Sequence, residues 1–185
     1  METTTAVERR TEALVENKMK VLVAIDESDG SFCALRWALD QLFSNYPVSP
    51  GLELQDQEQN SITLVNVQPL FQPFIYPAGP VVYATPQVID AVKKAQEENA
   101  ANILSRALQM CRENKVKAET LILQGDPKDK ICQAAEELHV DLVVLGSRGL
   151  GTIKRALLGS VSNYCVHHVN CPVLIVKPPT KSAHE

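Results

Sequence analysis

Four glycines and a serine in the segment GSRGLGTIKRALLGS, Gly146 to Ser160, have a spacing that suits the binding of an anion. Glycine lets the backbone turn out of a strand and approach a ligand that a side chain would block. Gly159 and Ser160 open a helical stretch, where free N–H groups and the positive end of the helix dipole favour phosphate oxygens. Ser160 and Ser162 add hydroxyl groups. We interpret this segment as a phosphate site.

Two better known nucleotide motifs do not fit the segment. A P-loop needs GxxxxGK[ST], and no GK[ST] follows these glycines at the right distance. A GxGxxG that starts at Gly149 would need a third glycine where Lys154 stands. Read one at a time, the glycines also fit ordinary turns, and Ser160 fits a simple helix cap. The joint spacing favours the phosphate site.

Three cations lie in the same segment, Arg148, Lys154 and Arg155. Cations on an exposed loop are often only solvated, so we choose Arg148 alone as the residue that neutralises phosphate charge. The part that reads IKRALL has an alternative interpretation as one amphipathic turn packed on the sheet. The whole chain has a net charge of −4 and a pI near 5.6, which disfavours broad binding to nucleic acid or to anionic membranes.

Short apolar segments alternate with helical patterns along the chain. This order predicts a parallel sheet with helices on both faces, whose ligand binds beyond the carboxyl ends of the strands. Ser28 or Asp29 is the expected N-cap of the first helix, and Asp126 with Pro127 is expected to open the third. The expected strands are 20–26, 61–67, 117–124, 140–146 and 172–177, and the expected helices follow within 27–43, 87–114, 126–138 and 160–169.

The 185 residues, 45% hydrophobic and 22% charged, suit one domain with tails. We expect a flexible extension over 1–18, a single domain over 19–178 and a tail over 179–185. Within the domain, 69–87 carries five of the chain's prolines and is expected to be a loop that folds over a ligand at the strand ends.

Composition also indicates a cellular compartment. No apolar run approaches the roughly 18 residues of a membrane span, and the first residues lack the pattern of a signal peptide. The five cysteines are odd in number, widely spread and without a CxxC pair, which favours reduced thiols over a disulfide framework. We therefore expect a protein of the cytoplasm, with the nucleus as a further location and no membrane partner.

The glycine segment fits G-x2-G-x9-G-[S/T], the ATP-binding signature of the universal stress protein family. KVLVAIDESDGSFCALRWAL resembles the first strand and helix of that family, ITLVNVQP its second strand and CPVLIVK its last. The resemblance covers Lys20 to Lys177. The forms GDPKD and GSRGLG resemble those of plant members, so we expect a plant protein.

This resemblance implies an α/β fold with a single five-stranded parallel sheet in the order 3-2-1-4-5, of the adenine nucleotide alpha hydrolase type. It also implies an adenine nucleotide, ATP or AMP with or without Mg²⁺, between the first and fourth strands, where the strand order reverses. The positions that match the family's nucleotide site are Ala24, Ile25, Asp26, Val67, Gly146, Arg148, Gly149, Gly159, Ser160, Val161 and Ser162.

Two of these positions have expected roles of their own. Asp26 is the candidate for the ribose hydroxyls or for a Mg²⁺ ion held indirectly through the nucleotide, while a strand-end Asp that caps the next turn is the alternative. Val67 matches the residue whose backbone meets the adenine edge. Partner surfaces are implied as well, because the family often dimerises through its last strand, here Val173–Lys177.

Three functions remain open from the sequence. The first is a nucleotide-dependent regulatory switch in a stress response, which acts on a protein partner that the sequence does not name. The second is a redox-responsive chaperone or interaction protein with a vestigial nucleotide site. The third is a weak ATPase or autokinase, for which we assign no catalytic residue because no Ser-His-Asp set, paired carboxylates or HExxH occurs.

Overall fold

The computed structural model describes residues 19–43, 61–70, 85–149 and 158–178. Five parallel strands form one sheet in the order β3-β2-β1-β4-β5, which confirms the predicted topology. The strands are β1 Lys20–Ala24, β2 Ser61–Gln68, β3 Lys117–Gln124, β4 Leu142–Gly146 and β5 Val173–Val176. The predicted extension 1–18, the tail 179–185 and most of the predicted loop 69–87 lie outside the described residues.

The three middle residues of the central strand β1 are apolar and buried, because the strand has a neighbour on each side and helices over both faces. It pairs with β2 from Lys20↔Ser61 to Ala24↔Val65 and with β4 from Val21↔Leu142 to Val23↔Val144. The strand order therefore reverses between β1 and β4. β3 differs from the expectation of strands that are apolar throughout, since it alternates partly buried and exposed residues as an edge strand does.

The helices begin at residues that cap them. Ser28 is the N-cap of α2 (Asp29–Ala38), which continues as a π-helical segment η1 (Leu39–Phe43). Asp126 caps α4 (Pro127–Glu137) by accepting from the N–H of Lys128 at 2.9 Å, as predicted. The last helix, α5 (Ser160–His168), has Gly159 at its N-cap, where no side chain caps the helix.

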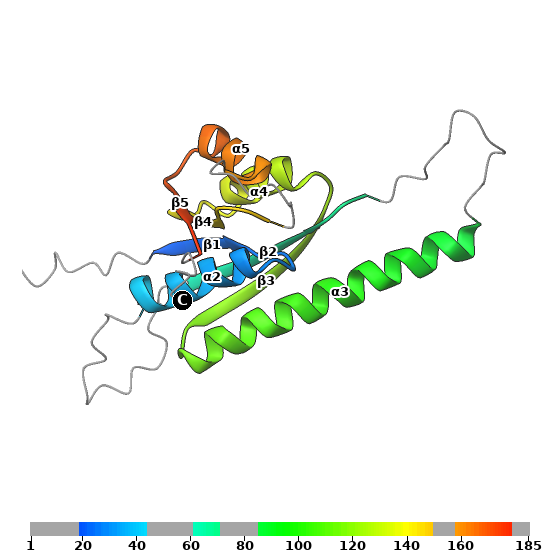
Figure 1. Cartoon of the computed structure of the whole chain (residues 1–185), viewed down its shortest axis with the longest axis horizontal. Coiled ribbons are helices and arrows are strands. Elements are labelled where there is room, and N and C mark those ends of the chain that lie inside the picture. Colours follow the sequence, from blue (N-terminus) through cyan, green and yellow to red (C-terminus); the bar gives the residue numbers. More distant parts are fainter. Residues whose placement is uncertain (1–18, 44–60, 71–84, 150–157, 179–185) are drawn as a thin grey trace, which may run out of the picture.

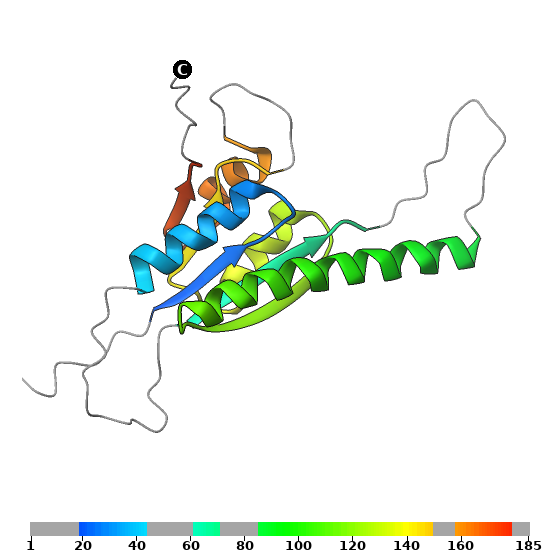
Figure 2. The same cartoon turned by 60° about the horizontal axis from the view of Figure 1, so that its bottom comes forward.

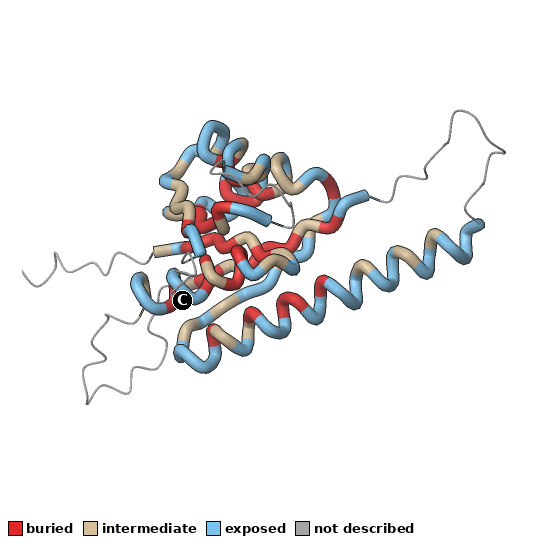
Figure 3. Tube along the Cα trace, in the orientation of Figure 1, coloured by how far each residue is buried: buried red, intermediate tan, exposed pale blue. Residues whose placement is uncertain are grey.

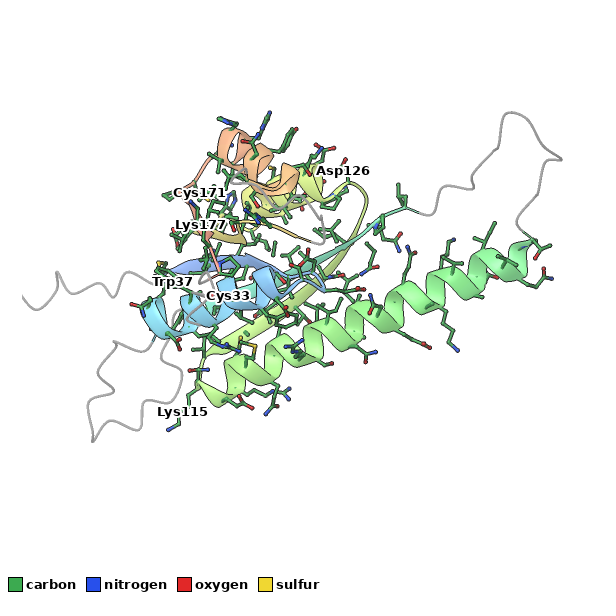
Figure 4. All side chains as sticks on the ribbon, viewed as in Figure 1. Cys33, Trp37, Lys115, Asp126, Cys171 and Lys177 are labelled. Atoms are coloured by element: carbon green, nitrogen blue, oxygen red, sulfur yellow. The ribbon has the colours of Figure 1, made fainter. Side chains whose placement is uncertain are left out.

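The second long helix, α3 (Pro86–Glu113), starts earlier than predicted. Thr85 is its N-cap and Pro86 its first residue, because proline fits the first turn of a helix even though it cannot continue one. The predicted loop 69–87 thus ends two residues too late. Figures 1 and 2 show that the first half of α3 extends beyond the sheet. Its buried residues begin at Ala100. At its other end, Lys115 lies in the turn that leads into β3 (Figure 4).

Helices cover both faces of the sheet (Figure 1). α2 and α3 pack on one face around an apolar cluster that includes Val23, Leu35 and Ala107, and α4 and α5 pack on the other around Leu22, Ala134 and Cys165. Figure 3 shows the buried residues gathered along the strands and the inner sides of the helices. Among the described residues, no helix is both long and apolar enough to cross a membrane.

Candidate functional site

A cleft of about 860 Å³ lies at the carboxyl ends of the strands, where the order reverses between β1 and β4. Parallel sheets of this kind bind ligands at that place, because the connections that follow the two strands run to opposite faces of the sheet and leave a crevice between them. All eleven residues predicted from the sequence line this cleft: Ala24, Ile25, Asp26, Val67, Gly146, Arg148, Gly149, Gly159, Ser160, Val161 and Ser162. The structure thus brings together positions from three strands, from the connections that follow β1 and β4, and from one helix. Gly151, Lys154 and Arg155 lie outside the described residues.

The two carboxylate oxygens of Asp26 have different surroundings: one is hydrogen-bonded to Ser28, and the other lies beside Gly149. Its Oδ1 accepts hydrogen bonds from the backbone N–H of Ser28, at 3.0 Å, and from the Ser28 hydroxyl. Its Oδ2 lies close to Gly149, where an added Cβ would be 2.8 Å away. The two interpretations of Asp26 are therefore compatible, because one oxygen caps the turn and the other remains beside the glycine loop.

Gly146 packs against the first turn of α2. An added Cβ at Gly146 would meet the carbonyl carbon and oxygen of Gly30 at 2.8 Å, and one at Gly30 would meet the Arg148 carbonyl oxygen at 2.6 Å. We predicted that Gly146 leaves room for a ligand, whereas the structure shows that it leaves room for a helix. This close packing determines where the loop from Ser147 to Gly149 lies.

The first turn of α5 presents backbone N–H groups to the cleft. Asn163 makes the first hydrogen bond within the helix, from its N–H to the Gly159 carbonyl at 2.9 Å. The N–H groups of Ser160, Val161 and Ser162 precede it and therefore have no carbonyl partner inside the helix. Because the positive end of the helix dipole lies there as well, this turn suits an anion.

The hydroxyl of Ser162 has a structural role. It is buried and donates to the Gly146 carbonyl at 2.7 Å, which ties the start of α5 to the end of β4. A second tie joins the Gly159 N–H to the Ser147 carbonyl at 2.9 Å. Ser160 is exposed at the cleft. Of the two predicted hydroxyl donors, Ser160 is therefore the one that remains available to a ligand.

Val67 turns its backbone toward the cleft. β1 makes its last backbone hydrogen bond to β2 from the Ile25 N–H to the Val65 carbonyl, at 2.8 Å. Backbone groups of alternate residues in a strand point to the same side, so those of Val67 also point toward β1, just past its end. The Ile25 carbonyl, the natural partner of the Val67 N–H, instead accepts from Asn66 Nδ2 at 2.8 Å.

The cleft has apolar walls and few charges. Among the described residues that line it, Asp26 is the single carboxylate and Arg148, which is exposed, the single cation. The apolar residues that line it come from β1 and the position after it, from β2, β4, α4 and α5, and from the segment just before α5. They are Ala24, Ile25, Val65, Val67, Pro127, Ile131, Leu145, Leu158 and Val161. Apolar walls with a small number of placed polar groups are typical of small-molecule sites.

Sequence reasoning missed three contributors to this site. Gly30 lies inside the first turn of a helix, and its contact with Arg148 depends on a partner 118 positions away. Ile131 lines the cleft from α4, although in the sequence it is one apolar residue of an amphipathic helix. Asn66 did carry a signal, because a buried polar residue within an apolar strand needs a hydrogen-bond partner.

Comparison with known proteins places this geometry among related chains. A family model described as the universal stress protein family matches residues 18–177. The chain is 32% identical over 158 residues to Universal stress protein YxiE of Bacillus subtilis, which covers 85% of this chain and 98% of the relative. It is 31% identical over 176 residues to Universal stress protein PHOS34 of Arabidopsis thaliana, covering 88% of this chain.

The match covers only part of some relatives. It spans 63% of PHOS34, and it spans 55% of a Universal stress protein A-like protein of Arabidopsis thaliana, which is 36% identical over 96 residues, or 52% of this chain.

Solved structures share the fold. A universal stress protein family protein from Arabidopsis thaliana, crystallised with AMP bound, is 28% identical with a TM-score of 0.58, covering 90% of this chain and 96% of that one. Universal stress protein UspA from Lactobacillus plantarum, at 22% identity and a TM-score of 0.63, has the same fold over 86% of this chain and 97% of its own.

Proposed function

This chain belongs to the universal stress protein family, and from that premise we propose that it binds an adenine nucleotide, ATP or AMP, in the cleft between β1 and β4. One observation carries the proposal. The N–H groups at the start of α5 and the loop residues Arg148 and Gly149 lie in one cleft with Oδ2 of Asp26. The AMP bound to the related Arabidopsis protein supports the same ligand class.

Each part of a nucleotide has a matching part of the cleft. Phosphate oxygens would accept from the N–H groups of Ser160, Val161 and Ser162, as anions do at helix N-termini. Ribose hydroxyls would donate to Asp26 Oδ2. The adenine ring would lie between apolar side chains, with the backbone N–H and C=O of Val67 at its edge. A donor and an acceptor side by side suit the edge of adenine, which offers an amino group and a ring nitrogen.

The phosphates of ATP carry several negative charges, which cations in the cleft would have to balance. Arg148 would neutralise part of the phosphate charge from the rim of the cleft. Asp26 Oδ2 is the kind of hard oxygen ligand that Mg²⁺ prefers, so we propose Asp26 as the residue that would hold a nucleotide-bound Mg²⁺ where it does not accept from the ribose hydroxyls.

We propose that the protein responds to nucleotide occupancy instead of turning the nucleotide over. Asp26 is the single carboxylate among the described lining residues, and its Oδ1 already accepts two hydrogen bonds from Ser28. Binding would add ligand contacts to the loop from Ser147 to Gly149, which packs on α2. A ligand that favours one arrangement of this loop would shift the population of the protein, as a regulatory switch requires.

Calorimetric titration of the full chain with ATP, AMP and GTP, each with and without Mg²⁺, tests the proposal. We expect binding of ATP or AMP and at least tenfold weaker binding of GTP, whose base has the opposite donor and acceptor at this edge. Gly149→Val should abolish binding, because the new side chain would collide with Asp26 Oδ2. Thr120→Val, an exposed site on the edge strand β3, is the matched control. Wild-type affinity in Gly149→Val, or no binding to the wild type, contradicts the proposal.

We also propose a homodimer through the last strand, Val173–Lys177. β5 is an edge of the sheet, and its apolar residues Val173, Leu174 and Ile175 remain partly exposed. An unpaired strand edge offers N–H and C=O groups to a second copy. The carbonyls of Pro172 and Val176 bond to β4, so the backbone groups of Val173 and Ile175 point to the open side.

Light scattering after gel filtration tests this interface. Ile175→Pro removes one outward N–H and leaves the bonds to β4 intact, so we expect monomers, while Ile175→Val should stay dimeric. A monomeric wild type, or a dimer that Ile175→Pro does not weaken, contradicts the proposed interface.

A further inference from the structure

Two cysteine side chains are in contact where α4 packs on α5. The Sγ atoms of Cys132, on α4, and Cys165, on α5, are 4.0 Å apart, although the residues are 33 positions apart in the chain. Cys165 is completely buried and Cys132 is partly exposed. The pair therefore combines one thiol that a small reagent can reach with a second one directly behind it.

The distance suits a disulfide. A disulfide needs its sulfurs at about 2.0 Å, so the two atoms must approach by roughly 2 Å. The helices are already held together near the pair, because the Tyr164 hydroxyl donates to Asp129 Oδ1 at 3.2 Å.

The two thiols differ in how readily they ionise. Burial raises the pKa of Cys165 to about 12, and the nearby sulfur of Cys132 adds to the effect. Burial also raises the pKa of Cys132, but the hydrogen bond with Cys165 acts in the opposite direction by stabilising the Cys132 thiolate. Cys132 is the more accessible thiol of the pair, and the contact between the two sulfurs favours its thiolate over that of Cys165, which makes it the first of the two to react with an oxidant.

We infer that Cys132 and Cys165 form a reversible disulfide when the protein meets a peroxide. The Cys132 thiolate attacks one oxygen of hydrogen peroxide, the O–O bond breaks and, after protonation of the hydroxide, one water leaves. The product is a sulfenic acid. The Cys165 sulfur, on losing its proton, then attacks the Cys132 sulfur, and the S–O bond breaks with loss of a second water. Two thiols are oxidised by two electrons, and one peroxide is reduced to two waters.

The bond would join two walls of the cleft. Ile131, next to Cys132, lines the cleft from α4, and α5 begins with the N–H groups of Ser160 to Ser162. This inference goes beyond nucleotide binding and does not depend on it, because the disulfide requires only the two sulfurs and a peroxide. Nothing in the cleft takes part in the reaction.

Peptide mapping of the full chain tests the inference. Reduced protein is treated with hydrogen peroxide, blocked with iodoacetamide, digested without reductant and analysed by mass spectrometry. We expect a peptide pair that links Cys132 to Cys165, lighter by two hydrogen atoms than the two thiol peptides, which dithiothreitol separates. The double variant Cys33→Ser, Cys171→Ser should still form the link. These two partly exposed thiols lie on α2 and just before β5 (Figure 4).

Cys132→Ser is the matched variant, because it keeps the size of a partly exposed side chain and removes one sulfur. It should not form the link. Recovery of Cys132 as a free thiol or as a sulfinic acid in the peroxide-treated wild type would overturn the inference. A link from Cys132 to any other cysteine, within the chain or between chains, would overturn it as well.

Discussion

Replacing Gly30 by alanine tests whether close packing between α2 and the loop after β4 shapes the cleft. The added Cβ would lie 2.6 Å from the Arg148 carbonyl oxygen, which belongs to the backbone and cannot rotate away. To reach an ordinary contact, α2 and the loop must separate by about 0.8 Å. Overpacking of this kind costs about 1–3 kcal/mol, and the better helix propensity of alanine returns at most about 1 kcal/mol.

The same displacement moves Gly149 away from Asp26, because Gly149 directly follows Arg148 in the loop. We expect Gly30→Ala to lower the free energy of unfolding by about 1–2 kcal/mol. We expect it to weaken ATP or AMP binding about tenfold, which corresponds to about 1.4 kcal/mol, although Gly30 does not line the cleft. Urea denaturation and calorimetric titration measure the two effects.

Asp29→Ala is the matched control for Gly30→Ala. Asp29 is the neighbouring, exposed residue of the same helical turn, so its replacement changes the helix without adding an atom near Arg148. It should alter stability by less than about 1 kcal/mol and leave the affinity unchanged. Gly30→Ala protein with wild-type affinity would refute the reasoning, since the loop would then tolerate the displacement.

Three further perturbations have expected outcomes. Ser162→Ala should cost about 1–2 kcal/mol in urea denaturation, because the Gly146 carbonyl loses its donor; an unchanged midpoint contradicts this. Asp26→Asn keeps an oxygen acceptor for Ser28, so stability should change by less than about 1 kcal/mol while nucleotide affinity falls about tenfold; a fall in stability with full affinity contradicts it. Burial raises the pKa of Cys111 to about 11 from 9.0, so the folded state keeps a proton that the unfolded state releases, and stability falls as pH rises from 9 to 11. Cys111→Ala should reduce this pH dependence. If the free energy of unfolding from urea denaturation falls equally steeply between pH 8 and 11 in the wild type and in the variant, the assignment is contradicted.

Local patterns were sufficient to predict most of the fold. Strand 117–124 was predicted with its exact bounds, and Asp126 with Pro127 was predicted to open α4, because caps and β-rich segments depend on neighbours in the chain. The strand order came from the family resemblance. The predicted start of α3 was one residue too late, because Pro86 was counted with the proline-rich loop and not as the first residue of the helix after the N-cap Thr85.

The parts of the site that depend on distant contacts were not predictable. Gly146 was assigned to ligand approach, and only the packed structure shows Gly30 in that space. Ser162 was predicted as a phosphate donor, whereas its hydroxyl is bonded to the Gly146 carbonyl. In both cases the residue was identified and its immediate partner was not, because the partner comes from another element of the fold.

Identification of the nucleotide released from freshly purified protein tests the central claim most directly. The protein is denatured and the released small molecules are analysed by mass spectrometry, beside a folded Gly149→Val, Gly159→Val double variant. The account predicts ATP, ADP or AMP from the wild type and none from the variant. A wild type that releases no adenine nucleotide and does not bind ATP with Mg²⁺ in titration would contradict it.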